Sequence, residues 1–318
     1  MLSPGGMDGG RDAGRSGGGA PSALADTAVA VVLFRPAPEQ VERVLARFRG
    51  GVPALLAFDN GGIPDAARAA MRDAGVRLLG EGANLGIAAG LNALAAAAAG
   101  EGCRYLLLLD QDADMSLDTL RTLRAAMGRL ARGPEPAAVV GPAPAPTTDR
   151  KAPRYPARPG IAPFGSLVPV EFLATSGSLL DLSAFARVGP FREDYFIDAV
   201  ELEWCFRAWA RGLTCWMETG AAIAHSVGGG VIRAPFLPVA MPRQPLFRMA
   251  AYVRNTCYGL TLPHVPGRWK RRQAAYLPLQ IALYWWDGGF RPAVLRRLLS
   301  AAVAGLRGRL GRPDDAPP

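Results

Sequence analysis

Acidic side chains follow an apolar run of the sequence, YLLLL at residues 105–109. Asp110 and Asp112 flank a glutamine there, and Asp114 follows two positions later. At a turn after a strand, two such carboxylates can converge, one on a ribose and the other on a divalent metal bound to a diphosphate. Mg²⁺ and Mn²⁺ suit this chemistry because they prefer oxygen ligands and share their coordination with substrate phosphates. A solvated acidic loop would have the same sequence, so the motif alone leaves both interpretations open.

Polar residues also follow two other apolar runs. Asp59 precedes Asn-Gly-Gly, a turn sequence, so it could form an Asx turn or accept a hydrogen bond from the N3–H of a pyrimidine. Asn84 precedes Leu-Gly and an alanine-rich stretch, where it could cap a helix, line a nucleotide pocket, or do both. Gly86 would allow the backbone to approach a ligand closely.

The second half of the chain carries a further acidic cluster and a histidine. Asp198, Glu201 and Glu203 lie in FIDAVELEW, and on a helix the first two share a face while Glu203 lies away from Glu201. Aromatic neighbours could raise the pKa of such a carboxylate toward that of a general base. The alternative is a solvated helix start, where acids favour the positive end of the helix dipole. His225 ends another apolar run and could bind a metal or a diphosphate, or make a structural hydrogen bond.

A scaffold that brings these residues together can be predicted from the apolar pattern. Continuous apolar runs predict buried strands at Thr27–Phe34, Pro53–Phe58, Val76–Leu79, Tyr105–Leu109 and Ala137–Gly141. The stretches between them predict helices at Glu39–Arg49, Asp65–Ala74, Ala88–Ala99 and Leu117–Arg132. This alternation with short connections predicts an α/β fold with a doubly wound, mainly parallel sheet. Ligands bind outside the carboxyl ends of the strands in such sheets, so we expect Asp59, Asn84 and Asp110 to converge there.

The pattern beyond this sheet is less regular. Residues 142–169 are rich in proline and basic residues and predict a long loop over the site. Later segments predict a strand-like stretch interrupted by a Thr-Ser-Gly-Ser turn, an amphipathic helix and two short strands, at residues 170–182, 194–209, 213–216 and 221–224. After about residue 241 the pattern changes to basic amphipathic helices.

Charge is distributed unevenly along the 318 residues. Residues 1–240 hold 23 Lys/Arg and 24 Asp/Glu, whereas residues 241–318 hold 13 and 3, so the formal charge of +9 is the sum of −1 and +10. Basic residues interleaved with aromatics fit an anionic membrane surface, contacted through residues 241–312. A single-stranded nucleic-acid surface and a solvated pair of helices are the alternatives; we favour the membrane and expect no nucleic-acid partner.

The same composition suggests three parts and a compartment. We expect a disordered glycine-rich lead-in at residues 1–25, a catalytic domain at 26–240 and a basic helical extension at 241–318. The sequence has neither an apolar secretory signal in residues 1–22 nor a run of 18 apolar residues. We therefore expect a cytoplasmic protein that lies peripherally at the inner face of the plasma membrane.

Taken together and in order, these motifs resemble an inverting GT-A glycosyltransferase of family 2, and within it the bacterial rhamnosyltransferases. The match runs from about residue 28 to 260, and weakly to 312. It is carried by FDNGG at 58–62, NLGIA at 84–88 with Asn92, LLDQD at 108–112, TSGSL at 175–179, FID at 196–198 with Glu201, EWC at 203–205 with Arg207, and His225. DQD and FID favour the rhamnosyl branch over generic members of the family.

The resemblance implies a nucleotide-sugar donor, with dTDP-L-rhamnose favoured and a UDP-hexose as the alternative. It implies that the base and nucleotide are held by Asp59, Asn84, Gly86 and Asp110. It further implies an Mg²⁺ or Mn²⁺ ion at Asp110 and Asp112, with His225 beside the diphosphate.

The resemblance also assigns the chemistry of transfer. The catalytic base falls at Glu201, with Asp198 as second candidate, and the acceptor would be a cell-surface glycan or its lipid-linked precursor. The acceptor side would be lined by Thr175, Ser176, Gly177, Glu203 and Trp204. Two positions depart from the family pattern: Arg35 stands where the first strand usually ends in an asparagine before proline, and Glu201 stands where the base is usually an aspartate. Arg35 could still bind a phosphate.

Overall fold

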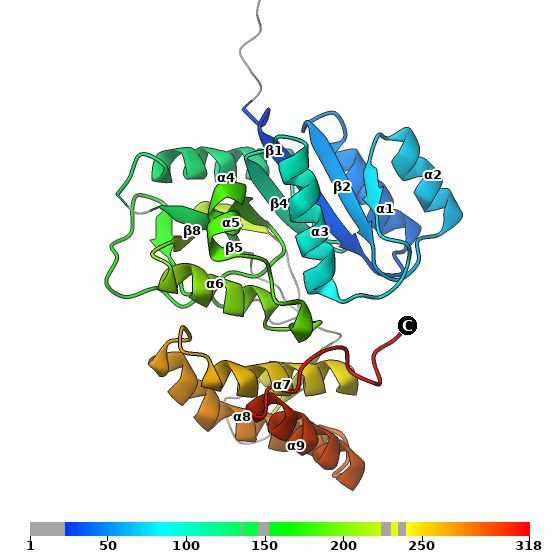
Figure 1. Cartoon of the computed structure of the whole chain (residues 1–318), viewed down its shortest axis with the longest axis vertical. Helices are drawn as coiled ribbons and strands as arrows, with labels where there is room; N and C mark the ends of the chain where they lie inside the picture. Colours follow the sequence, from blue (N-terminus) through cyan, green and yellow to red (C-terminus); the bar gives the residue numbers. More distant parts are fainter. Residues whose placement is uncertain (1–22, 135, 146–152, 224–229, 235–239) are drawn as a thin grey trace, which may run out of the picture.

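The structure, a computed structural model, describes residues 23–134, 136–145, 153–223, 230–234 and 240–318. In this part of the chain, an eight-stranded sheet with helices on both faces lies above a layer of three helices (Figure 1). The expected disordered lead-in falls almost entirely outside the described residues.

The first half of the sheet is parallel. Its strands are β1 (Thr27–Leu33), β2 (Ala54–Asp59), β3 (Arg77–Leu79) and β4 (Tyr105–Asp110), which pair in the order β3-β2-β1-β4. They alternate with the helices α1 (Pro38–Phe48), α2 (Asp65–Asp73), α3 (Ile87–Gly100) and α4 (Leu117–Leu130). Every residue of β1 is buried, as a strand covered on both faces requires. The mainly parallel, doubly wound α/β fold is thus confirmed.

The second half of the sheet is mixed. Its strands are β5 (Ala137–Pro144), β6 (Leu167–Pro169), β7 (Ser178–Asp181) and β8 (Thr214–Ile223), and the sheet continues from β4 as β7-β5-β8-β6. β7 runs antiparallel to both β4 and β5. Around these strands lie α5 (Leu182–Val188), the 3₁₀ turn η1 (Glu193–Tyr195) and α6 (Val200–Ala210). Two predictions were wrong here, since the expected strands at 213–216 and 221–224 are the single strand β8, and the expected loop 142–169 contains the end of β5 and all of β6.

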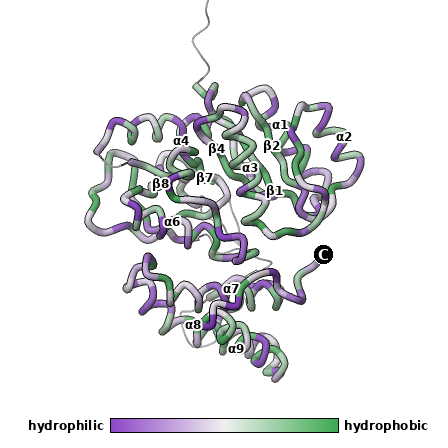
Figure 2. Tube along the Cα trace, in the orientation of Figure 1, coloured by the Kyte–Doolittle hydropathy of each residue, from purple (hydrophilic) through white to green (hydrophobic). Residues whose placement is uncertain are grey.

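The sheet separates two apolar cores. One packs α1, α2 and α4 against one face through residues such as Val41, Met71 and Leu123. The other packs α3, α5 and α6 against the opposite face through residues such as Leu91 and Trp204. The hydropathy colouring accordingly shows the strands as largely hydrophobic (Figure 2).

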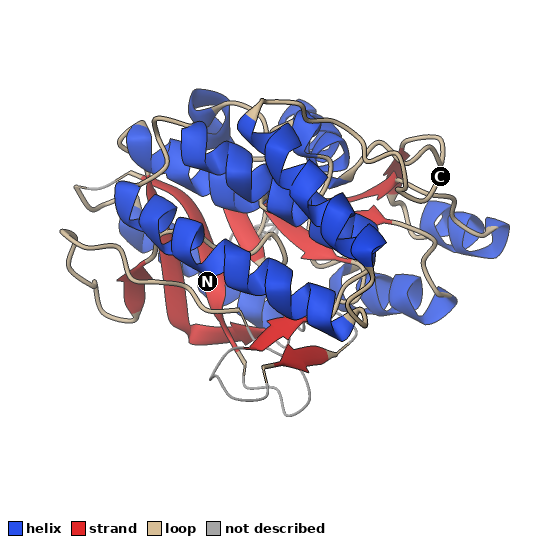
Figure 3. Cartoon of the chain, turned by 90° about the horizontal axis from the view of Figure 1, so that it is seen from below, coloured by secondary structure: helices blue, strands red, loops and turns tan. Residues whose placement is uncertain are grey.

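The C-terminal part adds the helices α7 (Leu246–Thr261), α8 (Gly267–Asp287) and α9 (Pro292–Leu306), preceded by the antiparallel pair β9 (Val231–Arg233) and β10 (Ala240–Pro242). Seen from below, this helical layer lies in front of the strands (Figure 3). α7 and α9 pack so closely that a Cβ added at Gly305 of α9 would lie 2.1 Å from the carbonyl oxygen of Arg254 in α7. The layer contacts the rest of the molecule where Trp269 of α8 packs edge-on against Phe206 of α6, with ring centres 5.7 Å apart. None of the helices in the described ranges is long and apolar enough to cross a membrane.

Candidate active site

Polar side chains gather at the carboxyl ends of β1, β2 and β4. Asp59, the last residue of β2, is in register with Leu33 of β1, and Asp110, the last residue of β4, is in register with Val32. The two acids therefore lie at the same edge of the sheet, with only β1 between them. This is the edge at which parallel α/β sheets bind ligands.

Gln111 orients the turn that carries Asp110 and Asp112. Its side chain accepts a hydrogen bond from the Phe34 backbone N–H (2.8 Å) and donates one to the Phe34 carbonyl (3.3 Å). The glutamine is thus tied to the end of β1, while Asp110 beside it is half-buried and Asp112 is exposed. Asp114 is directed elsewhere, since it pairs with Arg47 of α1 at 3.0 Å.

The Thr-Ser-Gly-Ser turn lies against Asp110. Ser176 is buried and its Oγ accepts a hydrogen bond from the Asp110 backbone N–H (3.1 Å). Gly177 donates its N–H to the Leu108 carbonyl (2.8 Å) and has a φ of +83°, which favours glycine. Ser176 and Gly177 thus support the turn that carries Asp110. The half-buried Thr175 is the member of the expected acceptor side that remains accessible.

Asp59 is engaged by its own surroundings. The residue is fully buried, and its carboxylate accepts hydrogen bonds from the Gly62 N–H (2.8 Å) and from Arg68 of α2 (2.6 Å). The Asx turn that the sequence suggested is therefore present. Arg68, which the sequence did not single out, fixes the carboxylate at the edge of the site.

The Asn84–Gly86 turn packs directly on the Phe-Ile-Asp segment. Gly86 has a φ of +86°, and a Cβ added to it would lie 2.6 Å from the Phe196 carbonyl oxygen. The same oxygen accepts a hydrogen bond from the Ile87 N–H at 2.8 Å. Asn84 is not the N-cap of α3, which was one of the roles the sequence allowed, because Gly86 occupies that position. Asn84 instead accepts a hydrogen bond from the Gly86 N–H at 3.2 Å.

The Phe-Ile-Asp segment has a strained backbone. Phe196, Asp198 and Ala199 have φ values of +62°, +63° and +63°, a region that non-glycine residues rarely occupy. Such strain costs about 1–3 kcal/mol per residue and is typical of functional sites. Asn255 of α7 holds the segment, because its amide donates to the carbonyls of Tyr195, Ile197 and Asp198 at 3.0, 2.9 and 2.9 Å.

Arg248, also on α7, binds the side chain of Asp198. Its Nε lies 3.2 Å from each carboxylate oxygen and its Nη2 lies 3.0 Å from Oδ1. Asp198 raises the pKa of this guanidinium further, so Arg248 stays protonated. Neither Arg248 nor Asn255 was identified as a site residue from the sequence. Asn255 lies between Arg254 and Thr256, so the local sequence gave no signal for its role.

Glu201, in the first turn of α6, differs from Asp198 in its environment. Burial raises the pKa of Glu201 to about 7, and the negative charges of Asp198 and Asp110 act in the same direction. Glu201 is half-buried, so part of the residue is still exposed to solvent. A carboxylate with a pKa close to neutrality is well matched to general-base catalysis.

Glu203 and Trp204 lie in the protein core, which corrects their expected place on the acceptor side. Glu203 is 2% exposed and is bound by Arg207 (2.8 Å) and by His264 (2.9 Å). Burial alone would raise the pKa of Glu203, but these hydrogen bonds outweigh it and lower that pKa. Trp204 is 1% exposed and donates its indole N–H to the Gly189 carbonyl (2.9 Å). Neither side chain can contact an acceptor.

Among the described residues, the possible metal ligands at the site are Asp110 and Asp112. The described part of the chain holds no group of three or more His, Cys, Asp or Glu residues placed to bind a metal. Two carboxylates nevertheless fit Mg²⁺ or Mn²⁺ when a diphosphate completes the coordination. His225, the third expected ligand, lies outside the described residues.

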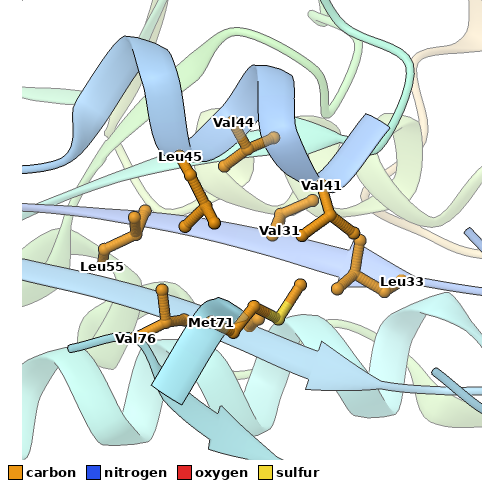
Figure 4. Close-up of a pocket in the computed structure, with 9 residues that line it drawn as sticks. Val31, Leu33, Val41, Val44, Leu45, Leu55, Met71 and Val76 are labelled. Carbon is orange, nitrogen blue, oxygen red and sulfur yellow. The ribbon is translucent and has the colours of Figure 1, made fainter. Parts of the chain in front are cut away.

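A separate pocket lies between α1 and the sheet (Figure 4). It is lined by Val31, Leu33, Val41, Val44, Leu45, Leu55, Ala57, Met71 and Val76. These side chains offer no hydrogen-bond partner to a phosphate or a sugar, so the pocket is a gap in the apolar core and not the site.

Comparison with known proteins found a partial sequence match. The chain is 25% identical over 154 residues to dTDP-rhamnosyl transferase RfbF of Shigella flexneri. The matched region covers 48% of this chain and 49% of that protein, so the chain spans about half the length of this curated relative. No protein-family model matches the sequence.

Two solved structures share the fold. GalNAc-T7 with UDP, GalNAc and Mn²⁺ superposes with a TM-score of 0.54 at 13% identity, over 80% of this chain and 54% of that one. S. aureus TarS 1–349 in complex with UDP superposes with a TM-score of 0.50 at 10% identity, over 92% and 98%. The chain has the GT-A fold.

Proposed function

We propose that this protein is a metal-dependent, inverting glycosyltransferase of family 2. The observation that carries the proposal is Glu201, a half-buried carboxylate with a pKa raised to about 7 that interacts electrostatically with the strand-end acid Asp110 in a GT-A fold. Charge that develops on a departing diphosphate needs stabilisation, and an acceptor hydroxyl needs a base. The site offers residues for both tasks.

The favoured donor is dTDP-L-rhamnose. The support is the partial similarity to a dTDP-rhamnosyl transferase together with the DQD and FID motifs. UDP-hexoses are the second candidate, since the two structures of the same fold contain UDP. The acceptor would be a cell-surface glycan or its lipid-linked precursor.

In the proposed reaction, Glu201 accepts the proton of an acceptor hydroxyl. The oxygen then attacks the anomeric carbon of the donor from the side opposite the nucleoside diphosphate, which leaves with the electrons of its C–O bond. Asp110 and Asp112 would hold Mg²⁺ or Mn²⁺, which when bound neutralises charge on the diphosphate. Asn84 and Gly86 would line the nucleotide site, where Asp59 shapes the edge and Thr175 faces the acceptor. His225 remains a candidate for the diphosphate side.

The proposal is tested by measuring nucleoside diphosphate release from a panel of nucleotide sugars with Mg²⁺, Mn²⁺ or EDTA. We expect dTDP release from dTDP-L-rhamnose above the rate without protein, and loss of that release in EDTA. Preference for a UDP-hexose would show that the proposed donor is wrong and that the proposed enzyme class is right. Absence of release from every donor, together with absence of nucleotide binding, would refute the proposal.

We further propose that α9 docks on an anionic membrane surface. Leu299, Val303 and Leu306 are exposed at 50%, 44% and 56% and recur on one side of this helix, and Arg296 and Arg307 beside them are also exposed. An apolar stripe flanked by arginines fits a lipid interface. The protein would then lie peripherally at the cytoplasmic face of the membrane.

Sedimentation with vesicles tests this docking. The full chain should sediment with vesicles that contain phosphatidylglycerol and should stay in solution with pure phosphatidylcholine. Replacing both Leu299 and Val303 with glutamate should abolish sedimentation without changing the thermal unfolding temperature. Undiminished sedimentation of the double variant would place the contact elsewhere.

A further inference from the structure

The segment that follows α9 returns to the proposed donor site. It covers residues 307–318, and in Figure 1 it runs from the red helix to the lower end of α3. There the Asn84 amide donates a hydrogen bond to the Pro317 carbonyl at 2.8 Å. Arg35 donates another to a backbone oxygen of Pro318 at 3.0 Å. The proposed function places Asn84 at the nucleotide, and the sequence indicated that Arg35 could bind a phosphate.

Arg312 binds the segment to the turn that contains Asn84. One of its nitrogens donates to the Asn84 carbonyl (3.2 Å) and the other to the Pro317 carbonyl (2.9 Å). Its guanidinium also lies 5.9 Å from the centre of the Phe196 ring. The arginine therefore links the Asn84–Gly86 turn, the strained Phe-Ile-Asp segment and the end of its own segment.

The residues before Arg312 and the residues after it are held to the protein by different contacts. Gly311 is fixed to the protein, because its N–H donates to the Asp194 carbonyl (2.7 Å) and its carbonyl accepts from Arg254 (2.5 Å). Beyond Arg312 the charged contact is the Asp315–Arg297 pair (2.6 Å), whose side chains are 44% and 33% exposed. Exposed ion pairs of this kind contribute little stability. Pro313 is buried, but the other residues of 312–318 are half-buried or exposed and are held by few contacts, so the segment can be released while residues up to Gly311 stay in place.

We propose that residues 312–318 are a gate over the donor-nucleotide site, closed in this structure and displaced when a nucleoside diphosphate binds. The inference rests on the proposed function, because it takes Asn84 and Arg35 as nucleotide-binding residues. Those side chains cannot bind Pro317 and Pro318 and a nucleotide at once. A diphosphate accepts strong, charge-assisted hydrogen bonds from arginine and would compete with Pro318 for Arg35. The nucleotide would thus replace the gate at Arg35.

Closure of the gate would weaken the apparent nucleotide affinity by the fraction of molecules that are open. We would measure the affinity for dTDP and for UDP by calorimetry with Mg²⁺, in the full chain, in a variant that ends at Gly311, and in Arg312→Ala. Both variants should bind nucleotide about fivefold to tenfold more tightly than the full chain. Asp314→Ala, a change at an exposed neighbour, is the matched control and should bind as the full chain does.

Hydrogen exchange reports the motion itself. Nucleotide should accelerate exchange in peptides that cover residues 312–316 and leave the Gly311 amide protected. Equal affinity in all variants would overturn the gate and leave the proposed function standing. Weaker binding by the shortened chain would also overturn it, since the segment would then form a wall of the site. Failure of every variant to bind either nucleotide would refute the proposed function, and the gate with it.

Discussion

Glu201→Gln is expected to lower the rate of sugar transfer by about 10²- to 10⁴-fold, the usual contribution of a general base. The amide has nearly the same shape as the carboxyl, so the affinity for the donor nucleotide should not change. Initial rates at saturating donor and acceptor, combined with calorimetric titration of the nucleotide, separate these two effects.

The pH dependence of transfer provides an independent check on Glu201. Because the pKa of this carboxyl is raised to about 7, it is protonated and unable to accept a proton below that pH. The rate of the unchanged protein should rise as pH passes through about 7 and then level off. The rate of Glu201→Gln should show no such rise near pH 7. A carboxylate at the ordinary value of 4.5 would give no change in this range.

Stability should respond to the same substitution with a definite sign. The pKa of Glu201 is higher in the folded than in the unfolded state, so the folded protein binds more protons and loses stability as pH rises from about 4.5 to 7. Glu201→Gln removes this loss. Its thermal unfolding temperature should match that of the unchanged protein at pH 4 and exceed it at pH 8.

Two further variants make the assignment of Glu201 specific. Asp198→Asn weakens the ion pair with Arg248 and should reduce activity less than Glu201→Gln, because Arg248 already engages the Asp198 carboxylate. Glu39→Gln, a change at an exposed glutamate in the first turn of α1, should have no effect. If Asp198→Asn abolishes turnover while Glu201→Gln remains active, Asp198 is the base.

The parallel half of the sheet could be predicted from the sequence because each buried strand is a continuous apolar run. β1 and β4 begin at the predicted residues, and their ends are shifted by one residue. The sequence pattern predicts two strands in place of β8, because Glu218 and Gly220 interrupt the apolar run. The Glu218 carboxylate is buried in the sheet and pairs with Arg129 of α4. That partner is 89 residues away, so local sequence gives no sign of it.

The helical extension shows what a charge count cannot reveal. Its surplus of +10 suggested one basic surface, but several arginines point inward and bind specific groups. Arg248 binds Asp198, Arg268 binds Glu171, and Arg254 donates to the Tyr195 carbonyl. α7 is therefore part of the framework of the site. Only the fold shows these contacts, because the partners are separated by about 50 to 100 residues of sequence.

Helix geometry and family resemblance gave conflicting indications for Glu203. Two residues apart on a helix, Glu201 and Glu203 face different directions, so only one of them can point into the site. The resemblance nevertheless placed Glu203 on the acceptor side. The structure follows the geometry, with Glu203 buried against Arg207 and His264.

Asp110→Asn and Asp112→Asn are expected to lower sugar transfer by at least about 10²-fold each, since a bound metal contributes several kcal/mol to stabilising the charge of the leaving group. Both substitutions keep the size of the side chain and the backbone hydrogen bond from Asp110 to Ser176. Folding should therefore be preserved, and thermal unfolding would verify this. Asp114→Asn is the matched control from the same turn, because Asp114 makes a surface pair with Arg47 and should leave activity unchanged.

Metal binding should be followed directly as well as through activity. Electron paramagnetic resonance with dTDP or UDP present should show Mn²⁺ bound to the full chain. It should show less protein-bound Mn²⁺ in Asp110→Asn and Asp112→Asn. The ion should bind poorly without nucleotide, because two carboxylates fill only part of an octahedral shell and the diphosphate must supply more of it. Activity that survives both substitutions, with Mn²⁺ binding unchanged, would exclude this pair as the metal site. The strand-end acids would then shape the pocket without binding the ion.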